Sequence, residues 1–167
     1  MADDSFERFY TATYARLLRQ LALVTGDRGD AEELLQEAFG RAALRWRRLS
    51  DYEAPEAWVR RVAMRLAADR ARRARRRAAA LLRLRPPPQP AADLSVESLD
   101  LASSMRRLSV GQRQAIVLHH LVGLSVGEVA GQLGIPVGTV KTRLARGRAA
   151  LARHLEVKDD QVVGNDG

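Results

Sequence analysis

A run of prolines near the middle of the chain limits its fold more than any other feature: three stand in a row at 86–88, and Pro90 follows. Each proline removes a backbone N–H and fixes φ near about −65°, so no helix can pass through this stretch. We therefore predict one domain over 1–85, a flexible acidic and Pro-rich linker over 86–104 and a second domain over 105–156. The polar end, 157–167, has nothing to bury and is predicted to be disordered.

The composition favours an all-α fold. Of the 167 residues 46% are hydrophobic but only 5% are aromatic, which is typical of helical proteins rather than β-sandwiches or barrels. There is no cysteine, which excludes thiolate catalysis, cysteine-bound metals and disulfides and fits a reducing compartment. No apolar run approaches the roughly 18 residues that a membrane span needs. We expect a cytoplasmic protein with two small helical domains joined by the Pro-rich linker.

The net charge of +8 is divided unevenly along the chain. Residues 1–40 hold 4 basic and 8 acidic side chains, 41–85 hold 15 and 4, 86–105 hold none and 3, and 106–167 hold 9 and 5. This division predicts several distinct surfaces, of which the basic ones suit nucleic acid. A basic block lying on an anionic membrane is a weaker alternative, because its apolar side is mainly alanine in the later turns.

Three helices are predicted in the first domain. Apolar residues over 6–24 recur at helical spacing, and Gly26 ends that helix. Asp30 and Glu33 form a variant of the capping box, which would open a second helix with an acidic outer face. Pro55 suits the first position of a third helix, whose later turns are rich in arginine.

The second domain is predicted to end in a helix-turn-helix. Capping boxes (Ser109 with Gln112, Ser125 with Glu128) and glycine stops delimit helices at 110–121, about 126–133 and about 137–154. Ala130 is small where two helices would cross, Gly134 lies where the turn needs a positive φ, and Val140 would pack the second helix back. The alternative is an ordinary helical hairpin with a basic face, but caps, turn and charges all agree with the helix-turn-helix.

Motifs for other chemistries are absent from the sequence. There is no GxxxxGK phosphate loop and no HExxH. His119 and His120 are adjacent, so on a helix they point about 100° apart and cannot share a metal. We expect no catalytic residue, no metal, no cofactor and no small-molecule substrate.

The motifs of both domains together resemble the extracytoplasmic-function sigma factors of bacterial RNA polymerase. The stretch 105–151, with LSVGQRQAIVLHHL and GLSVGEVAGQLGIPVGTVKTRLARGRAAL, is similar to that family's region 4, although Met105 stands where leucine is usual. DAEELLQEAF over 30–39 is similar to region 2.2, and PEAW over 55–58 with the later arginines is similar to regions 2.3 and 2.4. The resemblance covers about residues 5–156. It implies a sigma factor that binds core polymerase and directs promoter-specific initiation.

The resemblance also implies which residues meet which partner. The clamp helices of the polymerase β′ subunit would bind an acidic face beside an exposed leucine, made by Asp30, Glu33, Leu34, Gln36 and Glu37. Opening and binding of the −10 element would fall to Tyr52, Arg60, Arg61, Arg65 and Arg70. The −35 element would be recognised through Lys141, Thr142, Arg143, Ala145, Arg146 and Arg148, of which Arg143 and Arg148 would contact phosphates. The second domain would also approach the β flap of the polymerase.

Several points stay open in this interpretation. Arg65 stands where the family commonly has asparagine, so the resemblance does not fix how the −10 element is recognised. Trp58 lies on an apolar stripe and is expected to pack in the core rather than on a base. The acidic linker either mimics nucleic acid in a polymerase channel or is a solvated spacer. Many relatives are held inactive by an anti-sigma factor, which makes one a candidate partner. The alternative function is a free-standing helix-turn-helix regulator of duplex operators.

Overall fold

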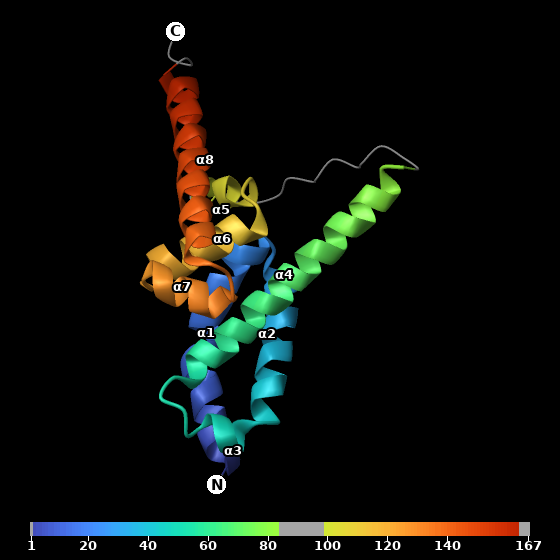
Figure 1. Cartoon of the computed structure of the whole chain (residues 1–167), viewed down its shortest axis with the longest axis vertical. Coiled ribbons are helices and arrows are strands. Elements are labelled where there is room, and N and C mark those ends of the chain that lie inside the picture. The colour runs from blue at the N-terminus through green and yellow to red at the C-terminus, as the bar shows by residue number, and fades with distance from the viewer. Residues whose placement is uncertain (1, 84–98, 164–167) are drawn as a thin grey trace.

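The computed structural model describes residues 2–83 and 99–163, with side chains over 4–83 and 101–154. The elements formed by these residues are all helices, joined by short turns and loops, and no strand occurs among them, which confirms the predicted all-α fold. Figure 1 shows two groups of helices: one at the N-terminal end, and one carrying the long C-terminal helix. The proline run and most of the predicted linker lie outside the described residues.

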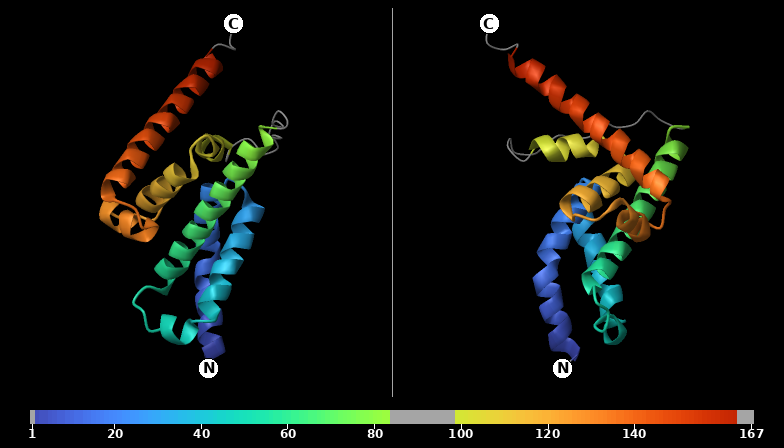
Figure 2. Two further views of the ribbon diagram at one scale, coloured as in Figure 1. Left: turned by 45° about the vertical axis from the view of Figure 1, so that its right-hand side comes forward. Right: turned by 60° about the vertical axis from the view of Figure 1, so that its left-hand side comes forward.

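The first half consists of α1 (Ala2–Thr25), α2 (Arg28–Ala43), the single turn α3 (Trp46–Leu49) and α4 (Pro55–Leu81). Helices α1, α2 and α4 pack on one another (Figure 2), and their facing sides bury aliphatic residues such as Leu21, Leu35 and Val59. Aromatic rings close the end near α3, where the Phe6 ring lies 5.3 Å from that of Trp46. These are the apolar positions that the helical spacing predicted.

Helix α2 begins earlier than predicted, because Asp27 and not Asp30 caps it. The Asp27 backbone is extended (φ −143°, ψ 130°), and its Oδ1 accepts a 2.8 Å hydrogen bond from the Asp30 N–H. Asp27 follows Gly26, which ends α1, so it is the first residue free to take the extended conformation of a cap. Asp30 already lies inside the first turn. The predicted Asp30–Glu33 capping box is therefore wrong.

Helix α4 starts at Pro55, as predicted, and continues far beyond the core of the first half. Its buried residues end at Ala67, and from Arg72 to the end of the helix every side chain is exposed. In Figure 1 these last turns form an arm that points away from the rest of the first half. The predicted arginine-rich extension of the third helix is confirmed.

The second half consists of α5 (Leu99–Arg106), α6 (Val110–Ile116), a π-helical turn η1 (Val117–Leu121), α7 (Val126–Leu133) and α8 (Val137–Val163). Two predicted boundaries are wrong. The predicted linker, 86–104, is too long, because α5 begins within it and buries Met105 against the core. The tail 157–167, predicted to be disordered, is helical as far as Val163, since extending a formed helix needs no new nucleus.

The helix-turn-helix is confirmed in its details. Both capping boxes of the second half are present, with the Ser109 and Ser125 side chains accepting from the backbone three residues on. Helix α7 ends at Gly134, whose φ of 64° is left-handed and costs glycine little. Val140 and Leu144 on α8 are buried beneath the motif. Local sequence is enough to place each of these features.

Gly147 allows α8 to lie close to α6, and we expect Gly147→Ala to destabilise the protein. A Cβ there would lie 2.7 Å from Cδ1 of Ile116, a buried side chain with little room to move. Overpacking of this kind costs about 1–3 kcal/mol and exceeds the gain of up to about 1 kcal/mol from replacing a helical glycine. Gly131→Ala in α7, where a Cβ meets open space, should instead stabilise slightly. Urea unfolding of both variants measures the change in the free energy of unfolding. A change of the same sign in both variants would contradict this expectation.

The two halves pack directly on each other, which the sequence pattern did not predict. Arg113 of α6 is buried, and its Nε donates to the Val24 carbonyl at the end of α1 at 2.6 Å. Gln114 is also buried, and its Nε2 donates to the Met64 carbonyl of α4 at 2.7 Å. Figure 2 shows the resulting arrangement, with α6 and α7 against α1 and α4. Two helical domains are confirmed, but here they share one interface.

Candidate polymerase and nucleic-acid interfaces

The exposed side of α8 carries most of the residues predicted to bind duplex DNA. Because Val140 and Leu144 are buried, the opposite side of the helix faces solvent. Thr142, Ala145 and Arg146 are exposed on that opposite side, and Lys141 and Arg148 are exposed at the flanks of the buried pair. From its start to residue 154, α8 contains no acidic residue, so nothing within that stretch offsets these cations. The arrangement provides long donors on a helix that projects from a turn, as groove binding requires.

Arg143 differs from the other predicted −35 residues. It is half-buried, and its guanidinium lies over Gly111 in the first turn of α6, since a Cβ on that glycine would come within 2.8 Å of Arg143 Cζ. Position 143 follows Val140 by three residues and therefore turns toward α6 rather than away from it. Arg143 packs the two helices together. Its predicted role as a phosphate contact finds no support in this position.

The predicted polymerase-binding face of α2 is partly exposed and partly committed to α4. Gln36 and Glu37 are exposed, and Glu37 pairs with Arg41 on its own helix at 2.6 Å. Asp30 and Glu33 pair with Arg70 of α4, at 2.8 and 2.6 Å. Arg70, predicted to contact DNA, is thus held by two residues predicted to bind polymerase.

Leu34 does not belong to the exposed face that was predicted. It is 4% exposed and packs in the core of the first half. The buried residues of α2 include Ala31, Leu35 and Ala38, and position 34 lies within the same stripe. The prediction of an exposed leucine beside the acids is therefore wrong. The acids remain at the surface without it.

Arg60 is the clearest departure from the predicted −10 surface. It is 8% exposed, its Nε donates to Gln20 Oε1 at 3.1 Å, and its Nη2 donates to Glu56 Oε1 at 2.9 Å. Burial lowers the pKa of Arg60, and the Glu56 carboxylate opposes that shift. Position 60 falls on the inward side of α4 with Ala63 and Ala67, so it cannot face DNA in this arrangement. The predicted role of Arg60 as a DNA contact finds no support in this buried position.

We expect Glu56→Gln to lower the free energy of unfolding at neutral pH by about 1–2 kcal/mol. Forked hydrogen bonds from Arg16, at 3.0 and 2.6 Å, lower the pKa of Glu56, although its partial burial acts in the opposite direction. A lowered pKa means that this contribution is present above the ordinary pKa of about 4.3 and is lost as the pH falls through the lowered value.

Urea unfolding at several pH values tests this expectation. The wild type should lose stability in acid more steeply than Glu56→Gln, so the difference between them should shrink as the pH falls. Glu53→Gln, in the exposed loop before α4, is the matched control and should change stability by less than about 0.5 kcal/mol. A constant difference between wild type and Glu56→Gln from neutral to acid pH would contradict the assignment.

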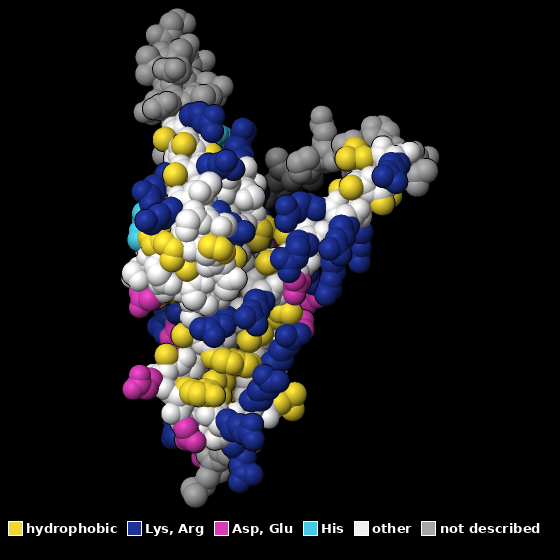
Figure 3. Space-filling model, in the orientation of Figure 1, with side chains coloured by type: hydrophobic (Ala, Val, Ile, Leu, Met, Phe, Trp, Pro, Cys, Tyr) yellow, Lys and Arg dark blue, Asp and Glu magenta, His cyan; other side chains and the backbone are white. Residues whose placement is uncertain are grey.

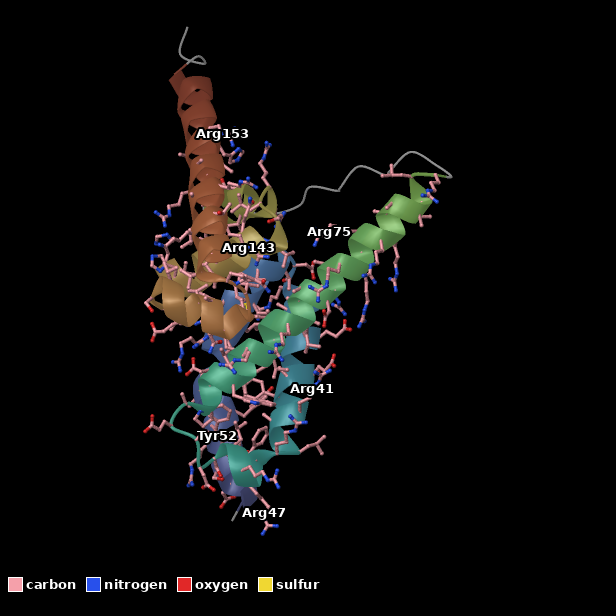
Figure 4. The ribbon with its side chains drawn as sticks, in the orientation of Figure 1. Arg41, Arg47, Tyr52, Arg75, Arg143 and Arg153 are labelled. Carbon is pink, nitrogen blue, oxygen red and sulfur yellow. The ribbon has the colours of Figure 1, made fainter. Side chains whose placement is uncertain are left out.

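Three of the predicted −10 residues are free to meet DNA. Tyr52 is 61% exposed in the loop before α4, and Arg61 and Arg65 are exposed on α4. Neither arginine makes an ion pair or hydrogen bond within the described residues. Figure 3 shows the arginine side chains of α4, in dark blue, from its free end toward the loop, and Figure 4 places Tyr52 beside the start of the helix. Trp58 is half-buried against the core, in keeping with its predicted packing role.

Metal sites and membrane spans find no support in the described residues. No group of three or more histidines and carboxylates over these ranges could hold a metal ion. None of the helices described is long and apolar enough to cross a bilayer. The burial of Arg113 and Gln114 was not predicted from the sequence. The usable signal was that both polar residues occupy positions on the inward side of an otherwise apolar helix.

Comparison with known proteins matches both halves to models of one family. Residues 9–77 match sigma-70 region 2, and residues 98–151 match sigma-70 region 4. The chain is 31% identical over 159 residues to the ECF RNA polymerase sigma factor SigC of Mycobacterium tuberculosis, covering 93% of this chain and 85% of that protein. It is 33% identical to the RNA polymerase sigma-E factor of Streptomyces coelicolor, covering 92% and 88%.

Two solved structures are similar over most of their length. CnrH, in complex with the cytosolic domain of CnrY, is 29% identical, with a TM-score of 0.59 and coverage of 93% of this chain and 90% of that one. The sigma factor RpoE of Bartonella quintana, in complex with the anti-sigma factor NepR, is 23% identical, with a TM-score of 0.68 and coverage of 92% and 98%. At that identity the second likeness supports the fold alone.

Proposed function

The chain belongs to the extracytoplasmic-function sigma factors, and on this basis we propose how its surfaces divide the work of starting transcription. As an alternative sigma factor it binds core RNA polymerase and directs promoter-specific initiation. The observation that carries this conclusion is the presence of sigma-70 regions 2 and 4 in order on one chain. RNA synthesis itself belongs to the core enzyme, so we assign this chain no catalytic residue.

We assign polymerase docking to the exposed acids of α2. Glu33, Gln36 and Glu37 lie along one side of the helix, and Asp30 lies at its start. The pairs that Arg70 makes with Asp30 and Glu33 are between partly exposed side chains and are each worth little. A cationic helix of the polymerase, such as the β′ clamp helices, can therefore compete for these carboxylates. The second half of the chain, which matches region 4, would lie near the β flap of the polymerase.

We assign the −35 element to the exposed side of α8, through Lys141, Thr142, Ala145, Arg146 and Arg148. We assign recognition of the −10 element and strand opening to Tyr52, Arg61 and Arg65. Arg61 and Arg65 are assigned to DNA because they are exposed and have no internal partner. Arg60 and Arg70 are left out because each is hydrogen-bonded inside the protein, to Gln20 and Asp30. As domain bounds we propose a region 2 unit over 1–85 and a region 4 unit that starts at about residue 99 and includes α5.

A free-standing regulator of duplex operators is less well supported. Such a protein would need its first half for ligand or dimer contacts, whereas residues 9–77 match sigma-70 region 2. An anti-sigma factor remains a candidate partner. Its support is that CnrH, which is 29% identical, was solved in complex with the cytosolic domain of a second protein, CnrY, and that the halves of this chain pack directly on each other.

Run-off transcription with purified core polymerase and a promoter library tests the function. The full-length chain should bind core polymerase and initiate from a defined set of promoters, while free duplex binding should be weak and fall steeply with salt. Tight, salt-resistant binding to an operator by a dimer, without initiation, would favour the regulator instead. Failure to bind core polymerase at all would refute the sigma-factor assignment.

A further inference from the structure

A cavity of about 400 Å³ lies between the two halves of the chain. Part of its lining is apolar and comes from both halves, including Val24, Leu34, Ala71, Leu108 and Val110. Four arginines also line it, which are Arg70 and Arg75 from α4, Arg106 from α5 and Arg113 from α6. Figure 4 shows Arg75 on the side of α4 toward the second half. The cavity therefore combines apolar surface with cations from two directions.

The arginines of this cavity carry more charge than its acid offsets. Among the described residues, Asp30 is the one acid that lines it. Arg70 is held by Asp30 and Glu33, at 2.8 and 2.6 Å. Arg75 and Arg106 are exposed and make no ion pair with any other described residue. Four guanidinium groups and one carboxylate give the lining a net charge of +3, which favours an anion.

Arg113 gives the cavity a buried cation that no acid neutralises. It is 8% exposed, and its Nε and Nη1 donate only to backbone carbonyls, those of Val24 and Leu108 among them. Burial lowers the pKa of Arg113, and no carboxylate in the described part of the chain opposes that shift. Its Nη2 donates no hydrogen bond to the described residues. Because a buried charge is costly unless it is paired, an anion within reach of Nη2 is favoured.

The size and lining of the cavity favour a small ligand over a docked segment of protein. Its volume is within the range of about 300–1,000 Å³ that is typical of small-molecule sites. A helix is about 10 Å across and rises about 5.4 Å per turn, so a single turn would fill the cavity. No aromatic ring of the described residues lines it, so a nucleobase has nothing to stack on. The apolar lining suits an aliphatic body, and the planar forks of arginine suit a phosphate.

We propose that this cavity binds a small organic phosphate with an aliphatic body, which acts as an effector and not as a substrate. The phosphate is bound by Arg75, Arg106 and Arg113, and the aliphatic body contacts the apolar lining. Because Arg75 belongs to the first half and Arg106 to the second, the ligand contacts both halves and stabilises their packing. The proposal goes beyond transcription initiation and does not depend on it, because the two packed halves alone form the site.

Isothermal titration calorimetry of the full-length chain with hexyl phosphate tests the site. Arg75→Ala/Arg106→Ala should weaken binding at least about tenfold, because it removes two charge-assisted contacts. Each single variant should weaken binding about threefold or more, since the two arginines come from different halves. Arg76→Ala/Arg107→Ala is the matched control and should bind like the wild type, because both residues are exposed neighbours outside the cavity. Hexyl phosphate should raise the thermal midpoint of the wild type and the control more than that of Arg75→Ala/Arg106→Ala.

Two partial ligands separate the proposal from weaker forms of binding. Inorganic phosphate should bind at least about tenfold more weakly than hexyl phosphate, because it has no aliphatic body to bury. Uncharged 1-hexanol should not displace hexyl phosphate. If inorganic phosphate binds as tightly as hexyl phosphate, the arginines attract any anion and the proposal fails. If 1-hexanol displaces hexyl phosphate, binding is apolar alone and the proposal also fails.

Two other results would overturn the proposal. Equal binding of hexyl phosphate by Arg75→Ala/Arg106→Ala and by the control would place the ligand elsewhere on the chain. Vesicles of phosphatidylcholine with phosphatidic acid distinguish a lipid headgroup from a free organic phosphate. If these vesicles bind the chain through Arg75 and Arg106 while hexyl phosphate does not, the arginines form a lipid-binding surface and the cavity binds no small effector.

Discussion

Replacement of Arg113 by alanine is expected to lower the free energy of unfolding by about 2–4 kcal/mol, the largest stability change we predict. The guanidinium donates 2.6 Å to the Val24 carbonyl, and its Nη1 lies 3.1–3.4 Å from the carbonyl oxygens of Leu108, Arg106 and Met105. Alanine would remove this donor from the Val24 and Leu108 carbonyls, although the Met105 carbonyl still accepts from the Leu108 N–H, and it would open a cavity between the halves. Arg113→Lys should recover only part of the loss, because one ammonium cannot reach carbonyls on both halves.

Urea unfolding followed by two signals measures both the size and the place of this effect. Both tryptophans, Trp46 and Trp58, lie in the first half, so fluorescence reports that half, whereas far-UV circular dichroism reports all helices. The two transitions should coincide in the wild type and separate in Arg113→Ala, with circular dichroism changing first. Arg107→Ala, an exposed neighbour, should remain within about 0.5 kcal/mol of the wild type. Coincident, unshifted transitions in Arg113→Ala would show that Arg113 does not join the halves.

The double substitution Lys141→Ala/Arg146→Ala is expected to reduce initiation at promoters that depend on a −35 element by about 25-fold or more. Both side chains are exposed on α8, Arg146 opposite the buried Val140 and Leu144 and Lys141 at the flank of that pair. A long donor to a base edge or phosphate contributes about 1–3 kcal/mol, so removing two costs at least about 2 kcal/mol. Thermal stability should not change, since neither residue makes an ion pair within the described residues.

Abortive or run-off transcription with reconstituted holoenzyme provides the measurement, and gel filtration with core polymerase provides the control for docking. Arg153→Ala is the matched variant, an exposed arginine further along the same helix, and should initiate like the wild type. Loss of core binding in the Lys141→Ala/Arg146→Ala protein would show that α8 docks on polymerase. Undiminished initiation at −35-dependent promoters would show that another surface recognises that element.

The residues predicted for the −10 element show where prediction from this sequence succeeds and fails. Arg60 and Arg61 are neighbours in a basic stretch, and both were predicted to meet DNA. A helix turns them about 100° apart, so Arg61 faces solvent while Arg60 reaches Gln20 of α1. The side that α4 turns toward α1 depends on the packing of three helices, and a single arginine-rich sequence does not define it. Arg70 likewise meets carboxylates of α2 that lie far away in sequence.

The features that could be predicted from the sequence alone are those settled within a few residues. The proline run, Pro55 at the start of α4, the capping boxes at Ser109 and Ser125, and the left-handed Gly134 each act through the local backbone. Together they were enough for the all-α fold, the helix-turn-helix and the sigma-factor resemblance, all of which are confirmed. The capping of α2 was missed because Asp27 and Asp30 carry the same side chain, and only the end of α1 decides between them.

Packing between distant helices, by contrast, decided which charged side chains are available to partners. Leu34, Arg60 and Arg113 lie inside because helices distant in sequence bury them, whereas Arg75 and Arg106 line one cavity because the two halves pack together. The physical reason is that a guanidinium is placed by whichever carboxylate or carbonyl the fold brings within about 3 Å. The spacing of residues along the sequence determines which side of its helix a residue occupies. The packing between helices determines which groups that side contacts.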